Sequence, residues 1–171
     1  MIKIDSREPE YLRDAVAGLC ASKGIASEVV CLEHGDYQFL SSDLSLVCIE
    51  RKEVHDYLNS LRTNHLADQL FRMITSGNVD IPILLIEGVL SLTTEGMCKT
   101  FKRETNWKFS SLANFEISCQ RQGILVQRIP SHKHTAQCIL DMYYYFQKAN
   151  HSSLIVTPMP FPSATGSNQY D

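Results

Sequence analysis

Short apolar runs alternate with amphipathic stretches over most of the chain. Apolar runs and period-two alternation predict strands at 1–5, 27–33, 37–40, 44–50, 81–88 and 124–129. Apolar residues spaced by three and four predict helices at 9–24, 54–61, 66–74, 106–123 and 132–150. Because strands and helices alternate, we expect an α/β layer architecture.

Two parts of this pattern say more about the sheet. Residues 37–40 and 44–50, joined by the turn SSD, are typical of a β-hairpin. Residues 81–88, IPILLIEG, form a continuous apolar run. Such a run predicts a strand that is buried on both faces of the sheet.

Length and charge limit what the chain can be. It has 171 residues, and from His151 the composition shifts to Ser, Pro, Asn and Gly. This predicts one domain over 1–150 and a weakly ordered tail or linker over 151–171. The net charge is −3, so a nucleic-acid-binding surface would have to be a local basic patch.

Cysteine usage and hydropathy indicate the compartment. Six cysteines occur singly among apolar residues without a CxxC pair, which favours buried reduced thiols over disulfides or a zinc site. The sequence shows no signal peptide and no apolar run long enough for a membrane. We therefore expect an intracellular protein, nuclear in a eukaryote and cytoplasmic if it is prokaryotic or viral.

Three charged residues end the apolar run of the strand at 44–50. Because strand side chains alternate, Glu50 and Lys52 share one face and Arg51 points to the other. A carboxylate there can bind Mg²⁺, and a lysine can position a water and balance phosphate charge. Asp36, in HGDY at the start of the preceding hairpin strand, is the candidate for a second metal-binding acid.

Further polar residues border the same place. If the next helix starts near Lys52, Asp56 shares its stripe. Asp5, Arg7 and Glu8 lie at the corner between the first strand and the first helix, and such corners commonly border a site. Each residue also has a simpler interpretation: a solvated strand end, turn chemistry at Asp36, or a helix cap at Asp5. Only the joint pattern favours chemistry.

That joint pattern resembles the XPF-type nucleases, a family that includes the archaeal helicase-associated nuclease Hef. IERKEVHDYL contains the ERKxxxD signature of the family, and IDSRE, HGDY and IPILLIEG match its first strand, its GD turn and the strand after the site helices. The order and spacing agree from Ile2 to Asn150. The resemblance implies a restriction-endonuclease-like, three-layer core with a central mixed sheet flanked by helices.

The resemblance also implies an activity and its residues. It implies a Mg²⁺-dependent endonuclease, with Mn²⁺ as a substitute, that cuts one strand of branched, flapped or forked DNA. Asp36 and Glu50 would ligate the metal together with a backbone carbonyl near Arg51, and Lys52 would assist the water and the phosphate. The residues that would complete or organise the site are Asp5, Glu8, Arg51 and Asp56.

The sequence departs from the family pattern in two places. His65 in NHLADQ stands where the family often has arginine, so phosphate binding at this position would be absent or pH-dependent. Family members usually carry a tandem helix-hairpin-helix module after the nuclease domain, which this chain lacks. Either that module was removed or the chain is a minimal nuclease.

Basic residues with interleaved aromatics give a candidate DNA surface. The densest basic segment runs from Lys99 to Phe109, and such a composition suits backbone contact and base stacking. The alternative is a solvated loop in which Trp107 anchors a helix to the core. The candidate DNA-binding residues are Arg7, Arg62, Lys99, Lys102, Arg103 and Lys108.

The aromatic segment MYYYFQK, residues 142–148, bears on assembly. The resemblance implies a homodimer, or a heterodimer with a related subunit, and this helix would contribute to it. The alternative is a helix buried within a single chain. For function, the leading hypothesis is the endonuclease; the others are a non-catalytic scaffold subunit and a restriction-like nuclease acting on duplex DNA or RNA.

Overall fold

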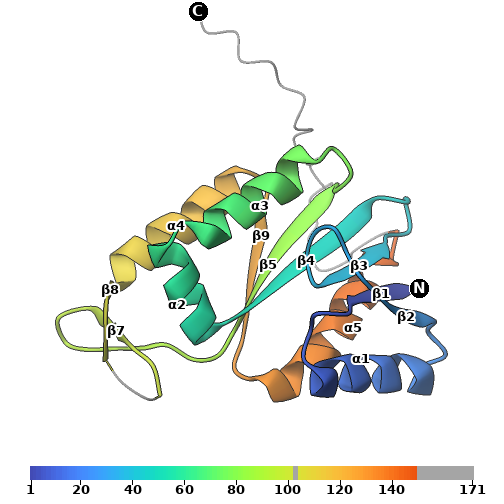
Figure 1. The fold of residues 1–171 in the computed structure, drawn as a ribbon, viewed down its shortest axis with the longest axis horizontal. Coiled ribbons are helices and arrows are strands. Elements are labelled where there is room, and N and C mark those ends of the chain that lie inside the picture. Colours follow the sequence, from blue (N-terminus) through green and yellow to red (C-terminus); the bar gives the residue numbers. More distant parts are fainter. Residues whose placement is uncertain (102–103, 150–171) are drawn as a thin grey trace, which may run out of the picture.

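A six-stranded sheet with helices on both faces forms the body of the protein (Figure 1). The computed structural model describes residues 1–101 and 104–149; the predicted tail at 151–171 lies outside them. The sheet strands, in spatial order, are β2 (Ser27–Val30), β1 (Ile2–Asp5), β3 (Tyr37–Leu40), β4 (Leu46–Glu53), β5 (Ile81–Glu87) and β9 (Leu125–Ile129).

The sheet is mixed, as predicted. Strand β3 runs antiparallel to β1 and β4, while the β1–β2, β4–β5 and β5–β9 pairs are parallel. The helices are α1 (Glu10–Ser22), α2 (Val54–Arg62), α3 (His65–Thr75), α4 (Phe109–Arg121) and α5 (Thr135–Phe146), with a 3₁₀ turn η1 (His132–His134) before α5.

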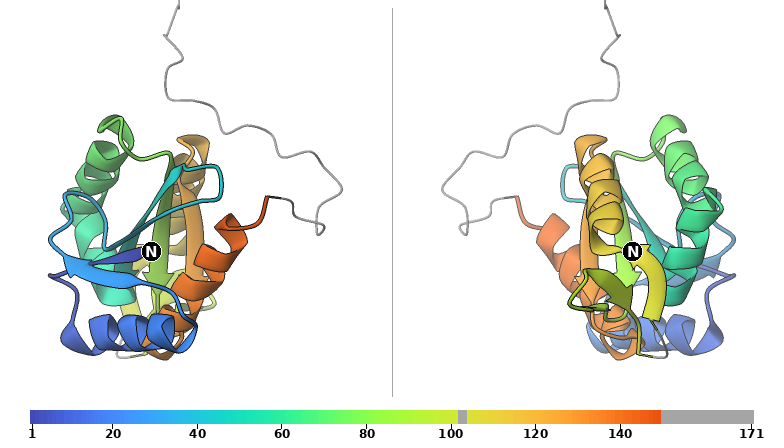
Figure 2. Two further views of the ribbon diagram at one scale, coloured as in Figure 1. Left: turned by 90° about the vertical axis from the view of Figure 1, so that its right-hand side faces the viewer. Right: turned by 90° about the vertical axis from the view of Figure 1, so that its left-hand side faces the viewer.

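Two apolar clusters separate the layers. One packs α1 and α5 against one face of the sheet, and the other packs α2, α3 and α4 against the opposite face (Figure 2). Every residue of β5 is buried, which confirms the strand predicted from IPILLIEG. The three-layer α/β/α arrangement follows because a sheet that is apolar on both faces needs helices on both.

Strand β4 is longer than predicted, and this changes the position of Asp56. The strand continues through Lys52 to Glu53, and α2 begins at Val54. The helix therefore begins where the predicted helix 54–61 begins, and the condition for Asp56 to share a helical stripe with Lys52 is not met. The physical reason is pairing: β4 stays in register with β5 as far as Glu53, which lies opposite Glu87. The Glu53 carboxylate then caps α2 by accepting from the His55 N–H at 2.8 Å.

A small three-stranded sheet replaces the predicted start of the helix at 106–123. Its strands are β6 (Ser91–Leu92), β7 (Met97–Lys99) and β8 (Glu104–Lys108). Exposure alternates along β8, with Trp107 turned inward against the cluster under α4. This confirms that Trp107 anchors to the core. The period of two, broken at Phe109, is the signal that the helical interpretation missed.

The cysteines and helices match the compositional expectations in most respects. All six cysteines are free thiols; Cys31 is exposed, and the other five are buried or partly buried. Cys31 follows β2, which ends at Val30 and so is shorter than predicted. Within residues 1–101 and 104–149, no helix is long and apolar enough to cross a membrane.

The turn between β2 and β3 has room for glycine alone at position 35. Gly35 has φ +69°, a conformation that side chains rarely adopt. A Cβ added there would lie 2.5 Å from the Cys48 Sγ and 2.9 Å from the Ile49 carbonyl oxygen. The turn therefore presses backbone against β4, and this close approach places the next residue, Asp36, at the strand.

Gly35→Ala should lower the free energy of unfolding by about 2–4 kcal/mol, because the variant adds left-handed strain to overpacking. Gly18→Ala is the matched control: this exposed glycine lies inside α1 with nothing within 4 Å of an added Cβ. It should stabilise the protein by about 0.5–1 kcal/mol. Urea unfolding of both variants measures the two values. Equal stability of the variants would show that the turn tolerates a side chain.

Candidate active site

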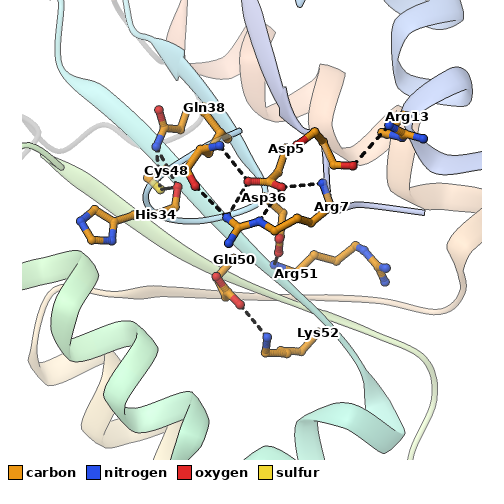
Figure 3. Close-up of polar contacts among 12 residues, drawn as sticks. Asp5, Arg7, Arg13, His34, Asp36, Gln38, Cys48, Glu50, Arg51 and Lys52 are labelled. Carbon is orange, nitrogen blue, oxygen red and sulfur yellow. Dashed lines mark hydrogen bonds and ion pairs between the residues drawn. The ribbon is translucent and has the colours of Figure 1, made fainter. Parts of the chain in front are cut away.

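The candidate site forms where the turn after Gly35 meets strand β4. The backbone N–H of Asp36 donates to the Ile49 carbonyl at 2.7 Å, and the Asp36 Oδ2 accepts from the Arg51 N–H at 2.7 Å. These two bonds hold Asp36 against the part of β4 that carries Glu50 (Figure 3). The antiparallel β3–β4 pairing thus brings together two acids that lie fourteen positions apart.

Glu50 and Lys52 project from one face of β4 and Arg51 from the other. The Lys52 Nζ lies 2.6 Å from the Glu50 Oε1, and both side chains are largely buried (Figure 3). Arg51 is held on the opposite face by Glu8, 2.9 Å from its Nε, and by Glu87, 3.2 Å from its Nη1. The side chains of IERK therefore alternate between the two faces of β4 as predicted. Arg51 and Lys52 consequently have different acidic partners.

Negative charge is concentrated at Asp36. Burial is the largest cause that raises the pKa of Asp36 to about 8; the charges of Glu50 and Glu8 contribute to the rise, and the Arg51 N–H and Lys52 oppose it. When all are ionised, five carboxylates stand against the three cations Arg7, Arg51 and Lys52. The five acids are Asp5, Glu8, Asp36, Glu50 and Glu87.

A divalent cation fits this donor set and its charge. The excess of two negative charges would be balanced by one such ion, which would also favour the ionised form of Asp36. Among the described residues, no group of three or more His, Cys, Asp and Glu side chains can hold a metal by itself. Mg²⁺ commonly uses one or two carboxylates, with water and substrate phosphates filling its other positions. Asp36 and Glu50 are two such carboxylates.

The chain has recognisable relatives among proteins of known class. Residues 4–142 match the sequence model of the ERCC4 domain. The chain belongs to the ERCC4 domain family. It is 29% identical over 159 residues to a protein from Dictyostelium discoideum named as a probable crossover junction endonuclease mus81. That match covers 85% of this chain and 17% of the relative, so the chain spans about a sixth of that protein's length.

Solved structures confirm the fold of this ERCC4 domain. XPF from Aeropyrum pernix, in complex with DNA, aligns with a TM-score of 0.62 and 22% identity over 84% of this chain and 63% of that chain. A second structure of the same protein aligns with a TM-score of 0.61 over the same shares. The XPF-type resemblance of the sequence and the predicted mixed sheet between helix layers are thereby confirmed.

The Asp5 side chain is fully engaged by its own corner of the ERCC4 domain. Its Oδ1 accepts from the Arg7 N–H and Nε at 2.6 and 2.8 Å, and its Oδ2 accepts from the Arg7 Nη2 at 2.7 Å and the Leu32 N–H at 3.0 Å. Helix α1 begins after Pro9 without a side-chain cap, so Asp5 is not its cap. Asp5 thus holds the backbone of this corner and fixes the guanidinium of Arg7, whose side chain is 64% exposed.

Three other predicted residues lie on exposed positions of α2 and α3. Asp56 is exposed on the first turn of α2, and Arg62 is exposed on its last turn. His65 begins α3, directly after Asn64, which adopts the left-handed conformation with φ 58°. Asn64 thus makes the sharp turn between α2 and α3 that presents His65 and Arg62 to solvent.

The predicted DNA-binding segment forms the β7–β8 hairpin. Lys99 and Lys108 are exposed on it, and Lys99 lies 4.0 Å from Glu104. Phe101 is fully exposed and Phe109 is half exposed. The remaining two candidates, Lys102 and Arg103, lie outside the described residues.

Sequence reasoning missed three residues that surround Arg51. Glu87 accepts from the Thr135 hydroxyl at 2.6 Å, and Glu8 accepts from the Tyr37 hydroxyl at 2.6 Å. Glu87 could have been found from the sequence, because it is an acid at the end of the otherwise apolar run of β5, as Glu50 is in β4. No local pattern marks Thr135 or Tyr37, because their contacts cross the sheet.

Asp5→Asn should lower the free energy of unfolding near neutral pH by about 2 kcal/mol, because it weakens the hydrogen bonds to Arg7 and Leu32. Burial by itself raises the pKa of Asp5, but the hydrogen bonds from Arg7 and Leu32 outweigh it and leave that pKa below its usual value. Since the folded form has the lower pKa, this contribution is present above about pH 4 and fades as the pH falls through the folded pKa.

Urea unfolding of wild type and Asp5→Asn at about pH 7 and about pH 3 checks this. The difference between the two proteins should shrink at the lower pH. Asp14→Asn, an exposed acid on α1, is the control and should change little at either pH. A difference that stays constant with pH would contradict the assignment to the Asp5 carboxylate.

Proposed function

We propose that this ERCC4 domain is a metal-dependent nuclease that hydrolyses one strand of branched, flapped or forked DNA. The single observation that carries the proposal is the meeting of Asp36 with the Glu50–Lys52 pair at one strand end. Two relatives support the substrate: one is named as a crossover junction endonuclease, and another was solved with DNA. Such an activity would operate where cellular DNA is kept, in a eukaryote the nucleus.

Asp36 and Glu50 would hold Mg²⁺, or Mn²⁺ in its place, together with a backbone carbonyl near Arg51. When bound, the ion would supply charge stabilisation at the phosphate and a more acidic water. Lys52 now donates to Glu50 at 2.6 Å. If the Glu50 oxygens turned to a cation, the Lys52 ammonium would be free to donate to a non-bridging phosphate oxygen or to orient the water.

Hydrolysis then needs little else from the chain. The water gives up one proton as its oxygen bonds to phosphorus, one bridging P–O bond breaks, and the leaving oxygen takes up a proton, so that one water is added overall. Burial of Glu50 and Lys52 limits competing bulk water and strengthens their electrostatic effect on the phosphate. Arg51 lies on the other face of β4 and does not point to the same place, so its role is to hold the strand.

Exposed basic side chains would bind the DNA backbone. Arg7 lies close enough to Asp36 for their charges to interact, so it would contact phosphates next to the scissile one. Arg62 on α2 and Lys99 and Lys108 on the β7–β8 hairpin would extend the contact, with Lys102 and Arg103 as further candidates. The net charge of the chain is −3, so we expect weak and steeply salt-dependent binding.

The purified chain with Mg²⁺ should be incubated with labelled duplex, single-stranded, flap and fork DNA. Cleavage that requires a flap or fork, and stops when EDTA removes the metal, is the expected result. Cleavage of plain duplex at one sequence would support a restriction-like nuclease. Absence of cleavage on every DNA, with the fold intact, would support a non-catalytic scaffold subunit.

Glu50→Gln and Asp36→Asn should each lower the cleavage rate by at least about 100-fold, because the substitutions keep shape but remove the charge that holds the metal. DNA binding should survive or tighten, since one carboxylate near the phosphates is gone. Lys52→Ala should lose rate while keeping metal affinity. Cleavage and DNA binding are measured on the same preparations.

The Glu50 and Asp36 variants should remain folded. If Glu50→Gln cut at the wild-type rate, the site would lie elsewhere. If it lost cleavage and binding together through unfolding, the strand-end interpretation of Glu50 as a structural residue would be correct.

We also propose that the domain dimerises, with itself or with a related subunit, through β9 and α5. Strand β9 ends the order of the six-stranded sheet, and an apolar groove lies between it and α5, lined in part by Val126, Cys138, Met142 and Tyr145. The aromatic segment is divided: Tyr143 and Phe146 pack on the core, whereas Tyr144 and Tyr145 are 42% and 48% exposed. An edge strand beside an apolar groove favours a protein partner.

Sedimentation of the chain at micromolar concentrations should give a dimer mass. Tyr145→Glu should shift it to a monomer, because a charge would be buried in the apolar groove. Ile117→Glu is the control, since Ile117 is 53% exposed on α4, which covers the opposite face of the sheet from α5. A strictly monomeric wild type would contradict the homodimer and leave the related subunit to be tested by mixing.

A further inference from the structure

Glu87 is a buried acid that the proposed chemistry does not use. It is the last residue of β5, it is 4% exposed, and every other residue of that strand is apolar. In the parallel register it lies opposite Glu53, and Leu85 lies opposite Arg51. Glu87 and Arg51 therefore project from the same face of the sheet, behind the Glu50–Lys52 pair.

The contacts of Glu87 are specific and few. Its Oε2 lies 3.2 Å from the Arg51 Nη1 and accepts from the Thr135 hydroxyl at 2.6 Å. Thr135 is the first residue of α5 and is fully buried. A hydroxyl from a different layer thus fixes the carboxylate oxygen that receives the arginine.

Arg51 is clamped from two sides. Glu8 accepts from its Nε at 2.9 Å and is itself held by the Tyr37 hydroxyl at 2.6 Å. The Arg51 side chain is only 9% exposed, so the hydrogen bonds of its guanidinium to both acids replace bonds to water that burial removes. Each acid is anchored by one buried hydroxyl, and the two acids and two hydroxyls come from the corner after β1, from β3, from β5 and from α5.

The ion pairs of Arg51 with Glu8 and Glu87 hold strand β4, which carries the candidate catalytic residues. Arg51 stands between Glu50 and Lys52 in sequence, and its own backbone N–H donates to Asp36 at 2.7 Å. A change in the Arg51 side chain would therefore move the peptide units that orient Glu50, Lys52 and Asp36 together. Misplacement of such groups by a fraction of an ångström is costly to catalysis.

We propose that Glu87, anchored by Thr135, is a positioning residue that acts through Arg51 to hold the metal-binding acids in register. This inference rests on the proposed nuclease function and adds a residue from α5 to the machinery. It assigns Glu87 no contact with metal or DNA. A purely structural ion pair is the alternative, because buried pairs are common without any role in catalysis.

The domain contains a matched control for that alternative. Glu116 on α4 also pairs with an arginine, Arg128, and accepts from a buried hydroxyl, that of Tyr57, at 3.0 Å. This second acid–arginine–hydroxyl group ties α4 to β9 and α2, and it touches neither β4 nor Asp36. Loss of its charge should therefore cost stability alone.

The test uses the full chain and compares Glu87→Gln with Glu116→Gln. Glu87→Gln should lower kcat by about 10-fold or more with KM for DNA unchanged, and should weaken Mn²⁺ affinity by a similar factor, as seen when residues that orient metal ligands are changed. The affinity is read from the electron paramagnetic resonance signal of free Mn²⁺. Glu116→Gln should lower the unfolding midpoint and leave kcat and Mn²⁺ affinity unchanged.

A second pair of variants keeps the charge. Thr135→Val removes the hydroxyl with little change of shape and should lower kcat and Mn²⁺ affinity in the same direction, whereas Thr135→Ser should restore both. If Glu87→Gln does not fold, the two Thr135 variants decide whether the Glu87 contact positions the metal-binding acids. Wild-type kcat and Mn²⁺ affinity in Glu87→Gln, or equal losses in Glu116→Gln, would overturn the inference.

The outcome is separable from that of the proposed function. If the wild-type chain cuts no DNA, the nuclease proposal fails, and the Mn²⁺ affinities of the variants still decide whether Glu87 positions the acids. If wild type cuts and Glu87→Gln cuts equally well, the positioning role fails and the nuclease proposal stands.

Discussion

The burial of the Arg51 guanidinium is the constraint on which the centre of the structure depends. A buried cation without partners would cost several kcal/mol, so the fold must deliver two acids to it, Glu8 and Glu87. Those acids come from the corner after β1 and from the end of β5. Their hydroxyl partners, Tyr37 and Thr135, come from β3 and α5. One side chain thus requires five elements to be correctly placed.

On the opposite face of β4 the charges are not balanced, because two acids, Asp36 and Glu50, lie beside one cation, Lys52. Asp36 is half-buried beside the buried Glu50, which pairs with Lys52, and burial with mutual repulsion raises the pKa of Asp36 to about 8. Crowding acids in this way is unfavourable for folding. The apolar clusters on both faces of the sheet must offset that cost. Two neighbouring acids do not favour stability, and this cost is the physical argument behind the proposed binding of a cation.

Local order in the site comes from backbone contacts as much as from side chains. Gly35 allows the turn to lie against Cys48 and Ile49, and the resulting bonds fix Asp36 at both its N–H and its carboxylate. The corner at Asp5 is built in the same way, with the Leu32 N–H and Arg7 saturating one carboxylate. Rigid backbone at both corners keeps the acids close despite their repulsion.

Much of this could be read from the sequence because the relevant patterns are local. The continuous run of β5 predicted a doubly buried strand, and alternation in IERK predicted that Glu50 and Lys52 share a face while Arg51 does not. The GD turn placed Asp36 beside Glu50 once a hairpin was assumed. Errors arose where pairing overrode local preference: β4 extends past Lys52 because β5 continues beside it, and β8 takes residues that a helical pattern would also accept.

The order of the six strands of the main sheet and the five helices, the layer architecture, and the acids and bases of the strand end follow from the sequence alone, because side-chain periodicity and turn chemistry act over a few residues. Only the tertiary structure decided which charges are partners. Asp5 accepts from the Leu32 N–H across 27 positions, Arg51 pairs with Glu8 and Glu87, and Thr135 donates to Glu87 across 48 positions of sequence. Such pairings depend on how helices and strands pack in three dimensions, and no spacing along the chain encodes them.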